Sequence, residues 1–335
     1  MKKLFSSLVV LSSLLLTACG GSKEATKPAE TAAQATNPLK VGIVLSTGGL
    51  GDKSFNDSAY RGLEMAKKEL GVEFKYVEPA SSAEDEQFLR EYADANYDLI
   101  IATGFQMTDA AKKVAADYPN IKFAMIDDIV ESSNTRNLLF KEEEGSFLMG
   151  AVAAMMSKTG TIGFVGGIEV PLIQKFQRGY EQGAKYVNPN MKVLTAYAGG
   201  QNPFNDPLKG KEIAISEIKQ GADVVYHAAG ATGIGVIEGA KELGKYAIGV
   251  DSDQDDVAPG VVLTSMLKNV DVAVYDTVKS VIDGKFQAGT HAFGIAENGV
   301  GATDFRNTKE IIGAENLAKL DEIIAKIKSG EIVVK

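Results

Sequence analysis

Residues that suit the binding of a small ligand follow several short apolar segments of this sequence, at the point where each segment ends. These residues are carboxylates, an amide, a glycine, an aromatic residue and a lysine. They are Asp52, Phe55, Asn56, Asp127, Gly230, Asp251 and Lys268. Carboxylates, amides and ammonium groups form hydrogen bonds with polar ligands, and an aromatic ring offers a flat face to a planar one. Whether these side chains lie close together in the folded protein depends on how the strands that precede them are arranged.

Known catalytic motifs do not fit these residues. The stretch 48–54 lacks the Gly-Lys-Ser/Thr ending of a phosphate-binding loop, because Asp52 stands where glycine is required. The glycines of 233–239 miss the spacing of a dinucleotide fingerprint by one position. Neither His227 nor His291 lies in a recognisable catalytic triad, and packing or loop roles are the more common ones for such histidines. The sequence therefore indicates no catalytic site.

Two acidic pairs allow a second interpretation. Asp127 with Asp128, and Asp251 with Asp253, have the residue types of a metal site or an acid–base pair. For Asp128 and Asp253, helix capping or hydrogen bonding at a strand end is at least as good an explanation. We expect no bound cofactor or metal.

Short β-branched segments alternate with segments of helical period from residue 39 onward. Such alternation predicts an α/β protein with mostly parallel sheets and helices on both faces, in two lobes. The predicted strands are 40–45, 73–77, 99–103, 122–126, 161–165, 192–197, 223–226, 246–250, 261–266 and a strand near 292–295. Because ligands bind beyond the carboxyl ends of parallel strands, two such edges that face each other would form a cleft.

The lobes divide near residues 157–160 in this interpretation. We expect an N-terminal lobe over 39–157, a C-terminal lobe over 158–265, and a shared region over 266–335 that crosses between them. Helix signals support the elements: Ser54 begins a stretch that resembles a capping box, and Gly71 ends the helix that follows.

The N-terminus has the features of a secretory signal. Lys2 and Lys3 precede an apolar stretch that is shorter than the ~20 residues needed to span a bilayer. The ending Leu16-Thr17-Ala18-Cys19 resembles the lipobox of bacterial lipoproteins, which implies cleavage after residue 18 and lipidation of Cys19. Residues 19–38 contain almost no core-forming side chains, so we expect a flexible tether. This predicts a lipid-anchored protein on the extracytoplasmic face of the cell membrane.

The composition of the chain limits the kinds of protein that it could be. The chain has 335 residues, 45% of them hydrophobic, which is enough for two domains with buried cores. Its formal net charge of −9 argues against a nucleic-acid partner. One cysteine cannot form a cysteine-rich metal site, and two histidines leave little for a histidine-based zinc centre.

Five stretches of the sequence together resemble the basic membrane protein family of lipoproteins, which includes purine nucleoside receptors of ABC importers. The stretches are 48–56, 163–176, 227–233, 249–254 and 264–268. The resemblance runs in order from Leu39 to Lys268 and is looser beyond. It implies a type I solute-binding fold, with two α/β lobes and a nucleoside in the cleft between them. Ala231 departs from it, since many relatives carry glycine there.

The resemblance also implies a role for each candidate residue. Phe55 and Phe176 resemble the aromatic pair that sandwiches the base, and Asn56 and Asp127 resemble the groups that read its polar edge. Asp52, Gly230, Asp251 and Lys268 resemble ribose contacts. On spacing alone, Phe176 also fits a core position one turn from Leu172 and Tyr180, Asn56 fits a capping residue, and Lys268 fits a solvated strand end. Phe105 and Gln106 occupy a matching strand end as weaker candidates.

The expected function is binding of nucleosides of the adenosine, guanosine and inosine class, for delivery to an ABC permease with a cytoplasmic ATPase. A receptor of the same fold for a sugar or another small polar solute is the first alternative. An exported nucleoside hydrolase and a surface adhesin are further alternatives.

Overall fold

The computed structural model describes residues 38–335. The predicted signal peptide, Cys19 and nearly all of the predicted tether lie outside the described residues. Within 38–335 no helix has both the length and the apolar character needed to cross a membrane.

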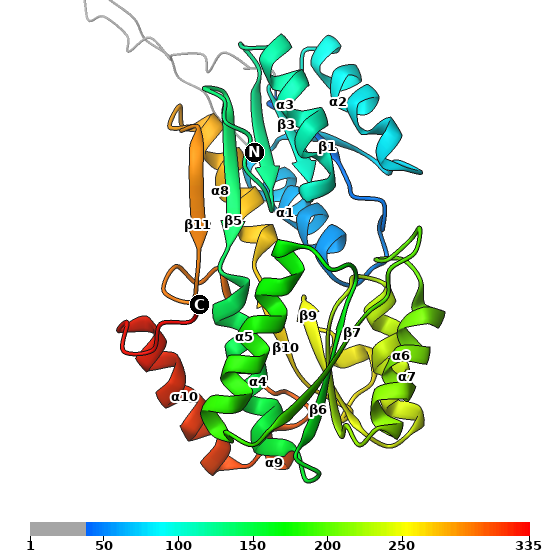
Figure 1. Cartoon of the computed structure of the whole chain (residues 1–335). Coiled ribbons are helices and arrows are strands. Elements are labelled where there is room, and N and C mark those ends of the chain that lie inside the picture. The colour runs from blue at the N-terminus through cyan, green and yellow to red at the C-terminus, as the bar shows by residue number, and fades with distance from the viewer. Residues whose placement is uncertain (1–37) are drawn as a thin grey trace, which may run out of the picture. The chain divides into compact units, whose positions relative to one another are not determined.

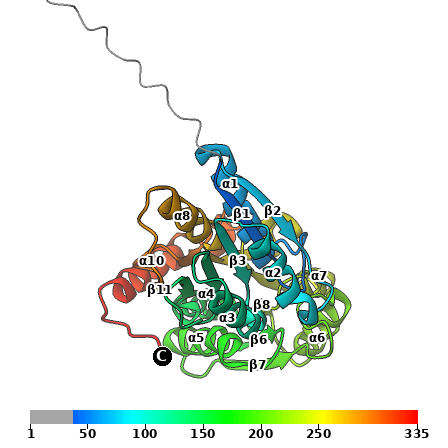
Figure 2. The ribbon, with the colours of Figure 1, turned by 90° about the horizontal axis from the view of Figure 1, so that it is seen from above.

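The first lobe is built on a six-stranded sheet whose strands are all parallel, in the order β11-β5-β4-β3-β1-β2. Its strands are β1 (Lys40–Val44), β2 (Glu73–Val77), β3 (Leu99–Thr103), β4 (Lys122–Ile126), β5 (Thr135–Phe140) and β11 (Gly289–Phe293). Its helices are α1 (Phe55–Leu70), α2 (Asp85–Asp94), α3 (Thr108–Asp117) and α8 (Val270–Ile282), with 3-10 turns η1 (Ser82–Glu84) and η2 (Phe105–Met107). Helices α1 and α8 lie side by side, as Figures 1 and 2 show.

The second lobe is built on a six-stranded sheet in the order β12-β10-β9-β8-β6-β7. Only β12 runs antiparallel to its neighbour, β10. The strands are β6 (Thr161–Gly166), β7 (Lys192–Tyr197), β8 (Val224–Ala228), β9 (Tyr246–Asp251), β10 (Val262–Lys268) and β12 (Val300–Ala302). The helices are α4 (Glu142–Met156), α5 (Pro171–Val187), α6 (Pro207–Lys219), α7 (Thr232–Glu242), α9 (Lys309–Ile312) and α10 (Ala314–Lys328), with the turn η3 (Asp255–Val257).

The predicted fold class is confirmed, but the sequence did not reveal strands β5 and β12. Strand β5 has the sequence Thr-Arg-Asn-Leu-Leu-Phe, whose first half is polar although the strand is almost entirely buried. The amide of Asn137 exchanges hydrogen bonds with the backbone of Val130, and the guanidinium of Arg136 donates to the backbone oxygen of Gln287. Because these polar groups find partners inside the protein, the strand is buried without an apolar sequence pattern.

The boundary predicted at residue 157 is wrong, because helix α4 belongs to the second lobe. Its surface is apolar nearly all round, and most of its residues are buried against α5, β10 and β12. Glycines allow α4 and α5 to approach closely: a Cβ atom on Gly150 of α4 would lie 1.9 Å from the backbone oxygen of Tyr180 of α5. The chain therefore enters the second lobe at Lys141, before α4 begins.

The chain passes between the lobes three times. The connections are 140–142 between β5 and α4, 268–270 between β10 and α8, and 294–299 between β11 and β12. Two of them are bonded to each other, since the backbone amide of Asn269 donates to the backbone oxygen of Gly299 at 2.9 Å. Because of these crossings, both lobes contain elements from residues 266–335. Of these elements, β10, β12, α9 and α10 belong to the second lobe, and α8 and β11 belong to the first.

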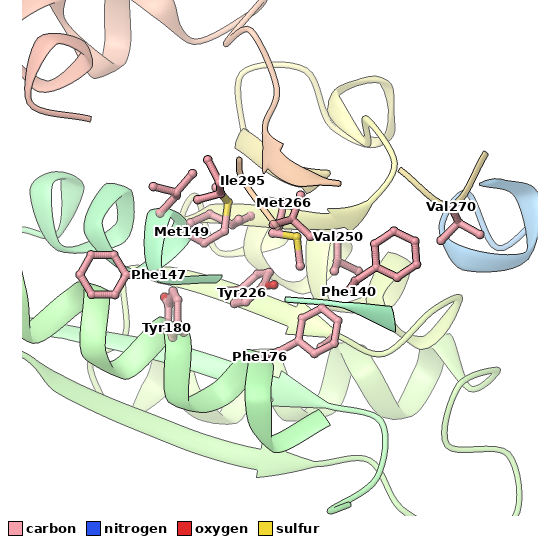
Figure 3. Packing of buried hydrophobic residues seen from close by; sticks show 14 of the residues in the cluster. Phe140, Phe147, Met149, Phe176, Tyr180, Tyr226, Val250, Met266, Val270 and Ile295 are labelled. Carbon is pink, nitrogen blue, oxygen red and sulfur yellow. The ribbon is translucent and has the colours of Figure 1, made fainter. Parts of the chain in front are cut away.

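The largest cluster of buried apolar residues contains side chains from both lobes, among them residues of α1, α4, α5 and α8. Figure 3 shows the ring of Phe176 from α5 and the ring of Phe140 from β5 at the same end of this cluster, near Val250. That end of the core meets the carboxyl ends of both sheets, where the candidate residues lie.

Candidate functional site

A cavity lies between the two lobes at the carboxyl ends of their parallel strands. It holds about 580 Å³ of space, some of it open to solvent. All eight residues predicted to contact a ligand line it: Asp52, Phe55, Asn56, Asp127, Phe176, Gly230, Asp251 and Lys268. The first lobe supplies four of them, from the loops after β1 and β4 and from the first turn of α1, and the second lobe supplies the other four.

Asp52 organises the start of α1. Its Oδ1 accepts hydrogen bonds from the amides of Ser54 and Asp57, and its Oδ2 accepts from the amide and the side-chain nitrogen of Asn56. Four donors occupy the carboxylate, so few of its lone pairs are left for a ligand. These contacts favour a positioning role for Asp52 over the ribose contact that the family resemblance implies.

The side-chain amide of Asn56 has a fixed orientation. Its Oδ1 accepts from the amide of Ser46 and from the Ser46 hydroxyl, both at 3.0 Å, while Nδ2 donates to Asp52 at 3.2 Å. With the oxygen occupied, only the second N–H of Nδ2 is available. Asn56 can therefore act as a donor toward the cavity.

Ser54 does not cap α1 with its side chain, contrary to the capping-box expectation. Its hydroxyl instead donates to Oδ2 of Asp251 in the other lobe, and its backbone oxygen accepts from the hydroxyl of Ser252. The hydrogen-bond acceptors that Ser54 would have supplied to the helix come from Asp52. The serine is thus free to join the two lobes.

Lys268 lies at the centre of a buried charge cluster rather than at a solvated strand end. Its side chain is 2% exposed, and its Nζ lies 2.6 Å from Oδ1 of Asp127 and 3.1 Å from Oε1 of Glu142. Glu142 has no exposed side-chain surface. Asp127 belongs to the first lobe and Lys268 to the second, so the ion pair spans the lobes.

Three phenyl rings surround the same ammonium. Nζ of Lys268 lies 5.1 Å from the ring centroid of Phe55, 5.1 Å from that of Phe140 and 5.6 Å from that of Phe176. These distances suit cation–π attraction, which gains strength where water is excluded. Phe176 is only 3% exposed and yet lines the cavity, so it is both a core residue and part of the cavity wall.

Burial shifts the pKa of the cavity carboxyls upward. Burial raises the pKa of Asp127 to about 6 although Lys268 opposes the shift, and it raises that of Asp251 to about 7 although Lys268 and the Ser54 hydroxyl oppose it. Burial also lowers the pKa of Lys268, but the carboxylates of Asp127, Glu142 and Asp251 outweigh it and raise the value. The ammonium therefore stays charged, and burial makes both aspartates weaker acids than an exposed aspartate.

Asp127, directly after β4, and Asp251, the last residue of β9, have left-handed backbone conformations. The φ angle is 72° at Asp127 and 64° at Asp251, and it is 55° at Gly230. Asp tolerates this region better than most residues, yet it is still less stable than the right-handed one by roughly 1–2 kcal/mol. Strain of this kind at two carboxylates facing one cavity is typical of functional sites.

Phe204 is a cavity residue that the sequence reasoning missed. It lies in the loop after β7, and its ring is 6.4 Å from that of Phe105 in the first lobe, in an edge-to-face arrangement. A Cβ atom on Gly167 would lie 2.3 Å from the Phe204 ring, so only glycine leaves room for this ring. The signal was present, because 198–206 follows a predicted strand end just as the other candidates do.

Hydrogen bonds within the protein occupy Asp128, Asp253 and His227, for which structural roles were the alternative to metal binding or catalysis. Asp128 accepts from the hydroxyl of Thr108, and Asp253 accepts from the amide of Asp255, as local hydrogen-bonding residues do. His227 is fully buried with a pKa lowered to about 4 by burial, and its Nε2 lies 2.9 Å from Oε1 of Gln254. Within residues 38–335 no three His, Cys, Asp or Glu side chains are grouped so as to hold a metal.

Comparison with known proteins identifies the family of this chain. Residues 39–335 match the family model described as ABC transporter substrate-binding protein PnrA-like, or Bmp. The chain belongs to this family. Among its relatives is basic membrane protein A of Borreliella burgdorferi, which is 36% identical over 98% of this chain and 94% of the relative. Another is the CD4+ T-cell-stimulating antigen of Listeria innocua, 35% identical over 98% of this chain and 96% of the relative.

A solved member of the wider group has the same fold. The ABC transporter solute-binding protein from Aeropyrum pernix K1 superposes with a TM-score of 0.81 at 32% identity, covering 89% of this chain and 94% of the other. As a PnrA-like family member, this chain is an ABC transporter substrate-binding protein, and a small-molecule ligand and permease partners follow from that class.

Proposed function

We propose that this protein is a lipid-anchored extracytoplasmic receptor that binds nucleosides, purine nucleosides preferred, and delivers them to an ABC permease. One observation carries the proposal: the eight residues that the family resemblance assigns to a nucleoside all line a single cavity between the lobes. Family membership supports the transport role, and the chemistry of the cavity supports the ligand class.

The base is held by aromatic rings and read along its polar edge. Phe55 and Phe176 approach the cavity from opposite lobes, and stacking against such rings is worth roughly 1–3 kcal/mol per base. The remaining N–H of Asn56 donates to a ring nitrogen or carbonyl oxygen of the base. Asp127 accepts from an N–H of the same edge while it stays paired with Lys268.

The sugar is held by charged groups. The carboxylate of Asp251 accepts hydrogen bonds from vicinal hydroxyls, and the Lys268 ammonium donates to them. Each charge-assisted hydrogen bond of this kind contributes roughly 1.5–3 kcal/mol. Gly230, with φ of 55°, lets the backbone come close to the ligand. Asp52 acts through Asn56, whose side chain it holds.

The charge of the cavity supports a nucleoside over a nucleotide. Asp52, Asp127 and Asp251 line the cavity with Lys268 as the cation, and Glu142 adds a further carboxylate behind it. A phosphate group would enter this acidic surface without enough cationic partners. No chemical step is part of the proposal: a ligand that contacts both lobes favours the closed arrangement, which the permease then recognises.

Isothermal titration of the purified protein tests the proposal. We expect heat from adenosine, guanosine or inosine, weaker heat from cytidine and none from ribose, with no free base released during the incubation. Mass spectrometry of solute released on denaturation identifies a ligand that co-purifies. Binding of ribose alone would show a sugar receptor, and release of free base would show a hydrolase; either result overturns the proposal.

A further inference from the structure

Glu142 lies beside the cavity without lining it. It is the first residue of α4, directly after the chain enters the second lobe, and its side chain is completely buried. Its Oε1 lies 3.1 Å from the ammonium of Lys268, and its Oε2 accepts a hydrogen bond of 3.4 Å from Lys175 on α5. A carboxylate buried this deeply needs such partners, because an unpaired buried charge is strongly destabilising.

The two carboxylates on Lys268 belong to different lobes. Asp127 follows β4 of the first lobe, whereas Glu142 begins a helix that packs against α5, β10 and β12 of the second lobe. Lys268 ends β10 of that same lobe. Glu142 and Lys268 both belong to second-lobe elements and lie where the connections 140–142 and 268–270 leave that lobe. A relative movement of the lobes therefore changes the distance from Lys268 to Asp127 more than the distance from Lys268 to Glu142.

The ammonium would otherwise have several orientations. A lysine side chain has four rotatable bonds, and the rings of Phe55 and Phe140 belong to the first lobe. Within the second lobe, the Phe176 ring at 5.6 Å and the carboxylate of Glu142 at 3.1 Å hold Nζ near the cavity wall, and the carboxylate of Asp251 adds a further attraction. Asp127 receives one of the three N–H groups through Oδ2 and Glu142 faces a second, so one remains for a ligand.

We propose that Glu142 is a positioning residue for ligand binding: it holds the Lys268 ammonium at the cavity wall while the lobes separate, and so keeps it ready for the sugar of an incoming ligand. The identity of that ligand rests on the proposed function. The role of Glu142 does not, because it depends only on contacts within the second lobe.

The first test compares two ligands on the variant Glu142→Gln, which keeps the shape of the side chain and removes its charge. The probes are adenosine and 2′,3′-dideoxyadenosine, which differ only in the hydroxyls that Lys268 is proposed to contact. We expect adenosine affinity to fall about tenfold and dideoxyadenosine affinity to change less than threefold, so that the preference for the ribose form shrinks. An equal loss for both probes would show general damage and would overturn the positioning role.

Two variants serve as matched controls. Glu217→Gln alters another buried glutamate of the second lobe, 3% exposed and away from the cavity. Glu242→Gln removes the partner of Lys211, an ion pair on the helices α6 and α7. Both are expected to keep the preference of the wild-type protein for adenosine. A loss of preference in either control as large as that in Glu142→Gln would contradict the inference.

A second test needs no ligand and separates this inference from the proposed function. Urea unfolding is measured for Glu142→Gln, Lys268→Met and the double variant, all without added nucleoside. If Glu142 acts through Lys268, the effects on unfolding free energy are not additive, and the double variant is more stable than their sum predicts. Additive effects would overturn the inference even if nucleosides bind, and coupling without nucleoside binding would leave Glu142 in place and reject only the ligand.

Discussion

The ammonium of Lys268 donates a hydrogen bond of 2.7 Å to Oδ2 of Asp127, joining the last residue of β10 in the second lobe to the residue after β4 in the first. Both side chains are buried. This ion pair joins the two lobes at the wall of the cavity, so a change in the distance between the lobes also changes the charges that a ligand meets there.

Asp127→Asn is expected to weaken nucleoside binding by about tenfold to a hundredfold, because a buried hydrogen-bonded charge pair contributes roughly 1.5–3 kcal/mol when its neighbours exclude water. Titration calorimetry with adenosine measures the change. Asp128→Asn is the matched control, since the neighbouring carboxylate bonds to Thr108 outside the cavity and should leave affinity within twofold. Similar losses in both variants would reject a specific role for Asp127.

Phe55→Leu is expected to lower purine nucleoside affinity by roughly 1–3 kcal/mol, or about fivefold to 150-fold, because it removes a stacking face and keeps an apolar side chain. Phe74→Leu alters a first-lobe ring that packs on Tyr60 away from the cavity, and it should bind like the wild type. Unchanged binding in Phe55→Leu would show that the base does not stack on this ring.

The unfolding free energy of the ligand-free protein is expected to fall as pH rises from about 4 to about 7. Burial raises the pKa of Asp251 to about 7, above the ordinary value of about 3.9, so in this window the folded protein holds a proton that the unfolded chain has released. In Asp251→Asn the fall should be smaller by at least about 1 kcal/mol. Urea unfolding at pH 4.5 and 7.5 measures both proteins, and parallel pH profiles would contradict the shift.

Gly150→Ala is expected to lower the unfolding free energy although alanine favours a helix by about 1 kcal/mol. The added Cβ would lie 1.9 Å from the backbone oxygen of Tyr180, and forcing α4 and α5 apart costs typically 1–3 kcal/mol or more. Gly301→Ala, where no atom lies within 4 Å of an added Cβ, is the control. Thermal unfolding compares them; equal midpoints would show that the close helix contact is not required.

Cys19→Ser is expected to release the protein from the membrane fraction and to abolish incorporation of labelled palmitate. The residue lies outside the described part of the chain, so lipidation remains a prediction from the lipobox resemblance. Fractionation of cells that express each form, followed by immunoblotting, measures the distribution. Retention of the serine variant in the membrane fraction would show a different anchor.

The sequence predicted best those site residues that lie at the end of a strand. Asp127 and Gly230 follow buried parallel strands and Asp251 ends one, and the carboxyl ends of such strands meet at one edge of a sheet. Local pattern therefore sufficed for them. Phe204 lies in the loop after β7, a parallel strand that is only partly buried.

Other features depended on packing between segments far apart in the chain. Nothing near Glu142 in the sequence indicates a partner at position 268, and the choice of lobe for α4 is made by close contact with α5. The four donors that occupy Asp52 changed its assignment from ligand contact to support.

The sequence by itself determined the alternation of strands and helices, the sheet edges at which polar residues gather, and the family. Only the tertiary structure decided that Lys268 is buried among three rings and two carboxylates, and that the connections at Lys141 and Asn269 set the lobe boundaries. The physical reason is that periodicity records which face of an element is apolar, whereas the partner of a buried charge is fixed by elements that meet only after folding.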